Sequence, residues 1–290
     1  MAKARAIVKR RKAVQNIRKI TQTMQLIATA RYQRCLQRAV AGQPYTARIT
    51  ALVETLAGLE AVAHPLLRAN PEAESSLLLV ITSNRGLCGA YNASVLRLAT
   101  QRREKLLQAG LQPQMEVVGK KGISYLRFLG IEPARTITDV EDRIAYQRVA
   151  GLAEGYMRAY EARQVAQVDV AYMRFHSLGV QRPTVARLLP IEPPAAAAEQ
   201  RVGVRPQFEF SPAPAELLGR LIPQTVKARL YQYFNDALVS EQIARMVAMK
   251  AATDAAADMI KYLTRQYNRA RQTQITLELA DIVGGSEAVR

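Results

Sequence analysis

The residues whose types and spacing come closest to a ligand-binding motif lie in the segment Ser83–Gly89, which reads Ser-Asn-Arg-Gly-Leu-Cys-Gly. It follows an apolar run and precedes a stretch of helical composition, where an α/β domain places a phosphate-binding loop. The segment lacks the G-x-G-x-x-G spacing, and the chain contains no G-x-x-x-x-G-K-S/T motif. We therefore interpret it as a structural turn, with nucleotide binding as the alternative.

A second possible chemistry is nucleophilic catalysis by Cys88. A thiol nucleophile needs a nearby base, and His176 is the candidate in this part of the chain. No residue pattern supplies a group to orient that base, or an oxyanion hole. Cys35 and Cys88 form no C-x-x-C pair, and the only histidines are His64 and His176, so no zinc pattern is present. The sequence predicts no catalytic residue, no metal site and no cofactor.

Positive charge is concentrated at the start of the chain. The net charge is +17, and twelve lysines and arginines precede the first acidic residue, Glu54. This excess predicts an acidic partner surface: nucleic acid, lipid headgroups or acidic protein side chains. The cluster Lys9–Lys12 could contact nucleic acid or form a solvated helix face. Because the first aromatic residue is Tyr32, the cluster lacks the interleaved aromatic side chains expected of single-strand binding.

Glycine and proline are missing from two long stretches of the chain. The first glycine is Gly42 and the first proline is Pro44, and neither type occurs from Gln224 to Val283. A helix of the latter length would reach ~90 Å. Because the composition of these stretches also favours helix, we expect a long helix at each end of the chain.

Both expected helices carry rough heptad patterns, and each helix must bury one face against a partner. The two patterns predict that the ends of the chain pair as an antiparallel coiled coil. Small and polar residues stand where leucine is usual, so we expect a weak seam. The predicted seam consists of Ile7, Val14, Ile17, Thr21, Met24, Ala28 and Cys35 in the first helix, and of Ile243, Val247, Ala251, Ala257, Ile260 and Tyr267 in the last.

The middle of the chain alternates short β-rich runs with stretches of helical composition. This alternation is typical of βαβ units, and it predicts a small, mostly parallel sheet with helices packed on it. The expected strands are Leu77–Thr82, Met115–Gly119 and Val168–Phe175, and the expected helices follow Asn92, follow Lys120 and span Ile144–Ala162.

Together these patterns predict an α/β fold with long helices: an antiparallel two-helix coiled coil of N- and C-terminal helices, plus a small Rossmann-like, mostly parallel βαβ domain. We expect the first helix within residues 1–60, the α/β domain at 75–190, an irregular connection at 191–214 and the last helix at 215–285. No run of about 18 uncharged apolar residues occurs, so the sequence predicts no membrane span and only indirect membrane association.

Several segments, in order along the chain, resemble the gamma subunits of bacterial F-type ATP synthases. Ile7–Thr21 is similar to the family's opening helix, and Ser83–Gly89 resembles its S-D/N-R/K-G-L-C-G signature at Arg85, Gly86, Leu87, Cys88 and Gly89. Gln181–Pro190 resembles its Q-x-P-T-x-x-x-L-L-P segment. The strongest match is Ser240–Asp254, which reads SEQIARMVAMKAATD and precedes a further matching stretch, Tyr267–Leu279.

The resemblance implies a central rotor shaft that has no active site of its own. In that family the shaft couples ion-driven rotation of a c-subunit ring to ATP synthesis in catalytic beta subunits, and the reverse. The implied partners are the alpha and beta subunits, the epsilon subunit and the c ring, and not nucleic acid. The implied location is peripheral, on the cytoplasmic face of the bacterial plasma membrane. Proton and sodium remain alternatives for the coupling ion.

The resemblance also assigns interface roles residue by residue. Met24 falls at the family's beta-contacting methionine on the first helix. The tail from Ile275 falls in the region that sits in an apolar collar of the alpha–beta ring. The positions implicated in contacts with the beta catch region are Arg245, Arg271, Gln272 and Thr276.

Overall fold

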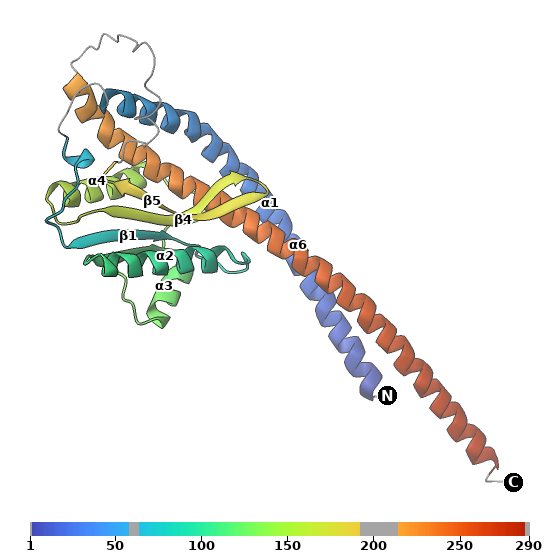
Figure 1. Cartoon of the computed structure of the whole chain (residues 1–290). Helices are drawn as coiled ribbons and strands as arrows, with labels where there is room; N and C mark the ends of the chain where they lie inside the picture. Colours follow the sequence, from blue (N-terminus) through green and yellow to red (C-terminus); the bar gives the residue numbers. More distant parts are fainter. Residues whose placement is uncertain (1, 58–63, 192–213, 288–290) are drawn as a thin grey trace, which may run out of the picture. The chain divides into compact units, whose positions relative to one another are not determined.

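The computed structural model describes residues 2–57, 64–191 and 214–287 (Figure 1). The chain divides into two compact units, one formed by Met1–Thr29 with Arg245–Arg290, the other by Ala30–Ala244. We call these the two-helix unit and the α/β unit. Each long helix, α1 (Ala2–Ala57) and α6 (Pro214–Glu287), contributes residues to both. Residues 192–213 of the predicted connection lie outside the described residues.

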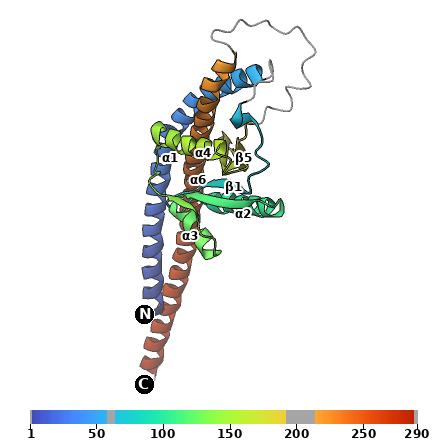
Figure 2. The same cartoon turned by 90° about the vertical axis from the view of Figure 1, so that its left-hand side faces the viewer.

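The predicted long helices and their antiparallel pairing are confirmed in the two-helix unit, where the first turn of α1 and the last turn of α6 lie toward the same end of the pair (Figures 1 and 2). Three side chains spaced seven residues apart are buried on each helix. Thr253 Oγ1 donates a hydrogen bond of 2.8 Å across the pair to Thr21 Oγ1. The buried seam consists of Val14, Thr21 and Ala28 on α1 and of Met249, Ala256 and Leu263 on α6.

Part of the predicted seam is wrong. Ile17, Met24, Val247 and Ala251 are exposed, although the heptad pattern placed them against the partner helix. The reason is the size of the residues that do pair: threonine and alanine let the helices approach closely along one line of heptad positions. On α1, Ile17 and Met24 therefore face outward, whereas Ile260 of α6 stays half-buried against the seam.

The α/β unit contains one five-stranded sheet in the order β3-β2-β1-β4-β5. Strands β1 to β4 are parallel, and β4 and β5 form an antiparallel pair at one edge. The predicted parallel βαβ core is thus confirmed, whereas the sequence did not reveal β3 or β5. The strands are β1 (Ser75–Ile81), β2 (Gln112–Val118), β3 (Arg135–Ile137), β4 (Val168–Ser177) and β5 (Val180–Leu189).

Both faces of this sheet are covered by helices, so the central strand β1 is buried throughout most of its length. Leu78 and Val80 point to the face covered by α2 (Tyr91–Gln108) and α3 (Lys120–Phe128). Leu77, Leu79 and Ile81 point to the other face. That face is covered by α4 (Tyr146–Glu161), by η1 (Pro65–Leu67) and by the parts of α1 and α6 within this unit (Figure 2).

Candidate functional site

The signature turn Ser83–Gly89 joins the end of β1 to the start of α2 (Tyr91–Gln108), and it is held by hydrogen bonds within itself and to Asn92 of α2. Ser83 Oγ donates to the Arg85 carbonyl at 2.6 Å, and the Ser83 amide donates to Asn92 Oδ1 at 3.0 Å. Asn92 Nδ2 lies 3.2 Å from the Cys88 sulfur. Cys88 is only 2% exposed. This geometry gives Cys88 a place in the turn's internal packing.

Leu87 is the most exposed apolar feature of this turn. Its φ is 64°, a left-handed conformation that costs roughly 1–2 kcal/mol for a residue other than glycine. Its side chain is nevertheless 60% exposed, so burial within the chain does not offset that cost. A bulky residue held outward in a strained conformation is typical of a contact point for another molecule.

The turn, together with Thr82 before it, also accepts hydrogen bonds from the N-terminal amides of α3. The Lys120 amide donates to Asn84 Oδ1 at 3.1 Å, and the Gly122 amide donates to Thr82 Oγ1 at 3.0 Å. The Lys121 amide donates to the Ser83 carbonyl at 3.1 Å. Three amides that could bind an anion are thus already satisfied within the chain, which favours the structural interpretation of this turn.

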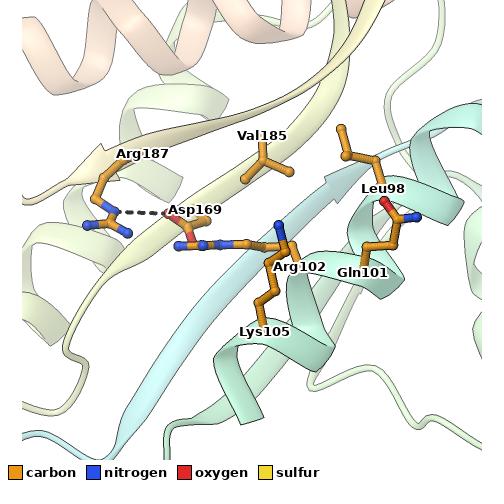
Figure 3. A pocket seen from close by; sticks show the side chains of 7 residues that line it. All are labelled: Leu98, Gln101, Arg102, Lys105, Asp169, Val185 and Arg187. Atoms are coloured by element: carbon orange, nitrogen blue, oxygen red, sulfur yellow. Dashed lines mark hydrogen bonds and ion pairs between the residues drawn. The ribbon is translucent and has the colours of Figure 1, made fainter. Parts of the chain in front are cut away.

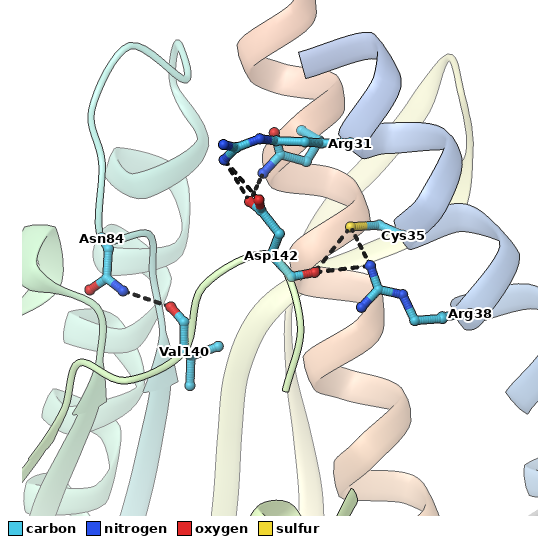
Figure 4. A network of polar contacts seen from close by, with 7 residues as sticks. Arg31, Cys35, Arg38, Asn84, Val140 and Asp142 are labelled. Atoms are coloured by element: carbon cyan, nitrogen blue, oxygen red, sulfur yellow. Dashed lines mark hydrogen bonds and ion pairs between the residues drawn. The ribbon is translucent and has the colours of Figure 1, made fainter. Parts of the chain in front are cut away.

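A loop after β3 connects this turn to the long helices within the α/β unit (Figure 4). On one side, Asn84 Nδ2 donates to the carbonyls of Thr138 (3.0 Å) and Val140 (2.6 Å). On the other, Asp142 pairs with Arg31 of α1 at 2.8 Å and accepts a 3.4 Å hydrogen bond from Gln242 of α6. The loop therefore contacts the turn and both long helices.

The main chain of Asp142 reinforces this connection. Its carbonyl accepts hydrogen bonds from Arg38 Nη2 at 3.1 Å and from the Cys35 thiol at 3.5 Å. Burial raises the pKa of the Cys35 thiol, which favours the protonated form that can donate this bond. Cys35 thus acts as a small, neutral packing residue in α1.

The two-helix unit carries a second candidate contact surface, an apolar stripe on α1. Its members recur at three- and four-residue steps, so they share one helix face that is distinct from the buried seam. A continuous apolar face on a helix this rich in cations indicates a partner surface. The apolar stripe comprises Ile17, Ile20, Met24 and Ile27, which are 52%, 55%, 37% and 48% exposed.

A groove of about 630 Å³ lies between the two helices toward their ends. Four of its nine lining residues are cationic, and Glu278 is the one acidic side chain of the wall. Arg11 stacks nearby, its guanidinium carbon 5.5 Å from the centre of the Tyr267 ring. The groove is lined by Arg5, Val8, Lys9, Lys12, Tyr267, Arg271, Gln274, Ile275 and Glu278.

From Ile275, which also lines the groove, the last turns of α6 expose a further apolar set. These residues occupy several faces of the helix, as expected if a partner surrounds it. The exposed set is Ile275, Leu277, Leu279, Ile282 and Val283.

The interface residues predicted from the resemblance all lie in the two-helix unit. Arg271 lines the groove, and Gln272 and Thr276 are exposed one turn apart, with the Thr276 hydroxyl donating to the Gln272 carbonyl at 3.0 Å. Met24 is part of the apolar stripe, whereas Arg245 is half-buried. The five signature residues lie together in the other unit.

Sequence reasoning found only part of the apolar stripe. Met24, Leu26 and Ile27 stand out in the sequence as apolar residues on a charge-dense helix, where they can face either a core or a partner. Ile17 was assigned to the seam, and Ile20 was not singled out. The available signal was the spacing 17, 20, 24, 27, which describes a second apolar face. Sequence reasoning also missed Asp142, because nothing local marks a loop carboxylate that reaches two helices distant in the chain.

Known proteins resemble this chain along its full length. A family model described as ATP synthase matches residues 3–289. The ATP synthase gamma chain of Rhodopirellula baltica is 44% identical over 295 residues, covering 100% of this chain and 99% of the relative. The ATP synthase gamma chain of Leptospira biflexa (strain Patoc 1 / Ames) is 36% identical over 290 residues and is covered completely, as is this chain.

Solved structures share the fold. A chain in the Euglena gracilis mitochondrial ATP synthase (OSCP/F1/c-ring, rotational state 3) superposes with a TM-score of 0.70 at 18% identity, covering 99% of this chain and 95% of that one. A chain in the rotor of the same enzyme, in rotational state 1, superposes with a TM-score of 0.64. The match covers 94% of this chain and 99% of that one. The full-length family match and these identities lead to one conclusion: the chain belongs to the ATP synthase gamma chain family.

Proposed function

We propose that the chain is the rotating central shaft of a bacterial F-type ATP synthase, and that it couples ion-driven rotation to conformational change in the catalytic beta subunits. One observation carries the proposal beyond family membership. The two-helix unit buries only a narrow seam and leaves the apolar stripe and the C-terminal apolar set exposed. Such surfaces are expected of a rod that works inside other subunits.

The stripe makes the rod asymmetric, which is what coupling requires. Chemically identical beta subunits can differ only if something asymmetric touches them, and each then shifts toward the conformation that binds the presented face. Moving a two-state equilibrium from 1:99 to 99:1 takes about 5.5 kcal/mol of differential binding. Burying the four half-exposed stripe residues at roughly 1 kcal/mol each supplies a large part of that energy.

The residues that we propose to contact the alpha–beta ring follow from exposure and from the resemblance. Met24 presents the apolar stripe, and the tail from Ile275 enters an apolar collar. Cationic and polar contacts to the beta subunits come from Arg245, Arg271, Gln272 and Thr276. Leu87 gives the signature turn an exposed contact point of its own.

The remaining partners follow from the family. The similar solved chains come from assemblies named as rotor and as OSCP/F1/c-ring. By analogy, the α/β unit contacts the epsilon subunit and the c ring, and the chain is peripheral on the cytoplasmic face of the plasma membrane. Among the described residues, no helix is both apolar and long enough to cross a bilayer.

In this proposal the chain is a mechanical subunit without catalysis of its own. The Cys88 thiol, its most plausible nucleophile, contacts Ser83, Arg85 and Asn92 inside the turn. The test is reconstitution of the purified chain with alpha and beta subunits. ATP hydrolysis should be absent in the chain alone and should depend on it in the assembly. Turnover by the isolated chain at an enzyme-like rate would overturn the proposal.

A further inference from the structure

A basic pocket in the α/β unit is separate from every surface described above (Figure 3). It opens between α2 and the strands β4 and β5, and its volume is about 410 Å³. Neither the signature turn nor the Asp142 loop contributes to its wall. The wall comprises Leu98, Gln101, Arg102, Lys105, Asp169, Val185 and Arg187.

A buried carboxylate organises the cations of this pocket. The Asp169 side chain is 1% exposed and accepts hydrogen bonds from Arg102 Nε at 2.8 Å and from Arg187 Nε at 3.3 Å. Gln167 Nε2 donates a third bond at 2.8 Å. Sheet register places Arg187 directly opposite Asp169. The two guanidinium groups are therefore fixed in position before any ligand arrives, which lowers the entropic cost of binding.

The pocket nevertheless holds more positive than negative charge. Arg102, Arg187 and Lys105 face a single carboxylate, which leaves an excess of two positive charges. Lys105 forms no ion pair in the part of the chain that the structure describes. Arg102 uses Nε for Asp169, so its two Nη groups remain as donors for a ligand.

This charge excess and this donor set match one ligand chemistry. A phosphate group carries about −1.5 to −2 charges near neutral pH and offers three acceptor oxygens. Guanidinium groups bind such oxygens through paired donors, and a lysine adds a point charge. Leu98 and Val185 give the cavity an apolar wall, which strengthens the field of the cations inside it.

We propose that this basic pocket binds a phosphate dianion, either free phosphate or the phosphomonoester end of a small molecule. The proposal does not depend on the rotary function, because the pocket involves none of the proposed ring contacts. Binding should strengthen as the pH rises through the second phosphate pKa, about 6 for a phosphomonoester.

The experiment titrates the purified full-length chain with inorganic phosphate and, separately, with glycerol 3-phosphate, followed by calorimetry and by ³¹P NMR. We expect saturable binding to one site by at least one probe. The tighter probe identifies the source: free phosphate, or a phosphomonoester that also fills the apolar part of the cavity. Lys105→Met should weaken binding about tenfold, the loss expected for a charged hydrogen bond.

Lys105 is exposed, so its replacement should leave the fold intact, and thermal unfolding without ligand checks this. Lys120→Met removes an exposed lysine outside the pocket and should leave affinity unchanged. Ligand should raise the Tm of the wild type and of Lys120→Met more than that of Lys105→Met. Absence of saturable binding by both probes, or equal affinity in wild type and Lys105→Met, would overturn the proposal.

Discussion

The two units of this chain use apolar side chains in opposite ways. In the α/β unit, both faces of the sheet are covered and side chains such as Leu79 and Ile222 are fully buried. In the two-helix unit, Val14 and Leu263 lie in a narrow seam, whereas Ile20 and other large apolar residues face outward. The α/β unit therefore buries its apolar side chains in its own core, whereas the two-helix unit keeps apolar surface for its partners.

The largest difference between the two units is expected when one isoleucine is truncated in each of them. Ile222→Ala removes a fully buried side chain of the α/β core, and we expect it to cost about 2–5 kcal/mol of unfolding free energy. Ile20→Ala removes a stripe residue and should change that free energy by less than about 0.5 kcal/mol. Urea unfolding of both variants measures the difference. Similar losses would mean that the stripe is part of a core.

Two glycines with positive φ angles, Gly119 and Gly130, test how tightly the α/β unit is packed. A Cβ at Gly119 (φ 96°) would clash with the Thr82 carbonyl, whereas one at Gly130 (φ 71°) meets nothing within 4 Å. Gly119→Ala should therefore cost about 3 kcal/mol, from strain plus overpacking, and Gly130→Ala about 1–2 kcal/mol, from strain alone. Chemical unfolding checks the order, and equal costs would refute the close approach of β1 to α3.

The α/β unit also buries a carboxylate whose burial is unfavourable. Desolvation raises the pKa of Asp236 from 3.8 to about 6, although Gln232 donates it a 2.8 Å hydrogen bond. The folded state thus binds more protons than the unfolded state between about pH 4 and pH 6. This group's contribution to stability falls as pH rises through that window and stays low above it.

Asp236→Asn removes the charge while keeping the shape of the side chain. We expect this variant to be on the order of 2 kcal/mol more stable than wild type at pH 7, with a flatter profile between pH 4 and pH 6. Denaturant unfolding at a series of pH values measures both quantities. If unfolding free energy varied with pH in the same way in Asp236→Asn and wild type, Asp236 would not be the source of the pH dependence.

Substitution in the apolar stripe is expected to have the smallest effect on stability and the most specific effect on function. Met24→Lys places a charge on the stripe and should leave unfolding free energy within about 0.5 kcal/mol of wild type. In the assembled synthase it should lower the ions pumped per ATP hydrolysed. Gln22→Lys adds the same charge at an exposed position off the stripe and serves as the control. Hydrolysis and pumping equal to wild type in both variants would remove the stripe from the mechanism.

Sequence predicted the elements with strong local signals. The absence of glycine and proline from Gln224 to Val283 predicted the long last helix, and β-rich runs predicted β1, β2 and β4. The three-residue strand β3 is too short to show a period. β5 contains Pro183, which is typical of an edge strand, and its polar and apolar residues do not alternate regularly, so the sequence of β5 does not look like a core strand.

The contact surfaces were less predictable than the fold, for a physical reason. A heptad pattern shows which positions can face a partner helix, but residue size decides which of them do. Ala28 and Thr21 let the helices approach along one line, and Ile17 was left outside. The grouping of Arg102, Asp169 and Arg187 depends on the register between β4 and β5, which no local pattern reports.

The most direct test of the central claim is to watch the chain turn. A bead is attached through a cysteine at the exposed position Gln108 (Gln108→Cys), since Cys35 and Cys88 are buried, and the alpha–beta ring is fixed to a surface. We expect the bead to rotate in one direction when ATP is added and to stop when ATP is exhausted. A stationary bead on a ring that hydrolyses ATP at its normal rate would contradict the account.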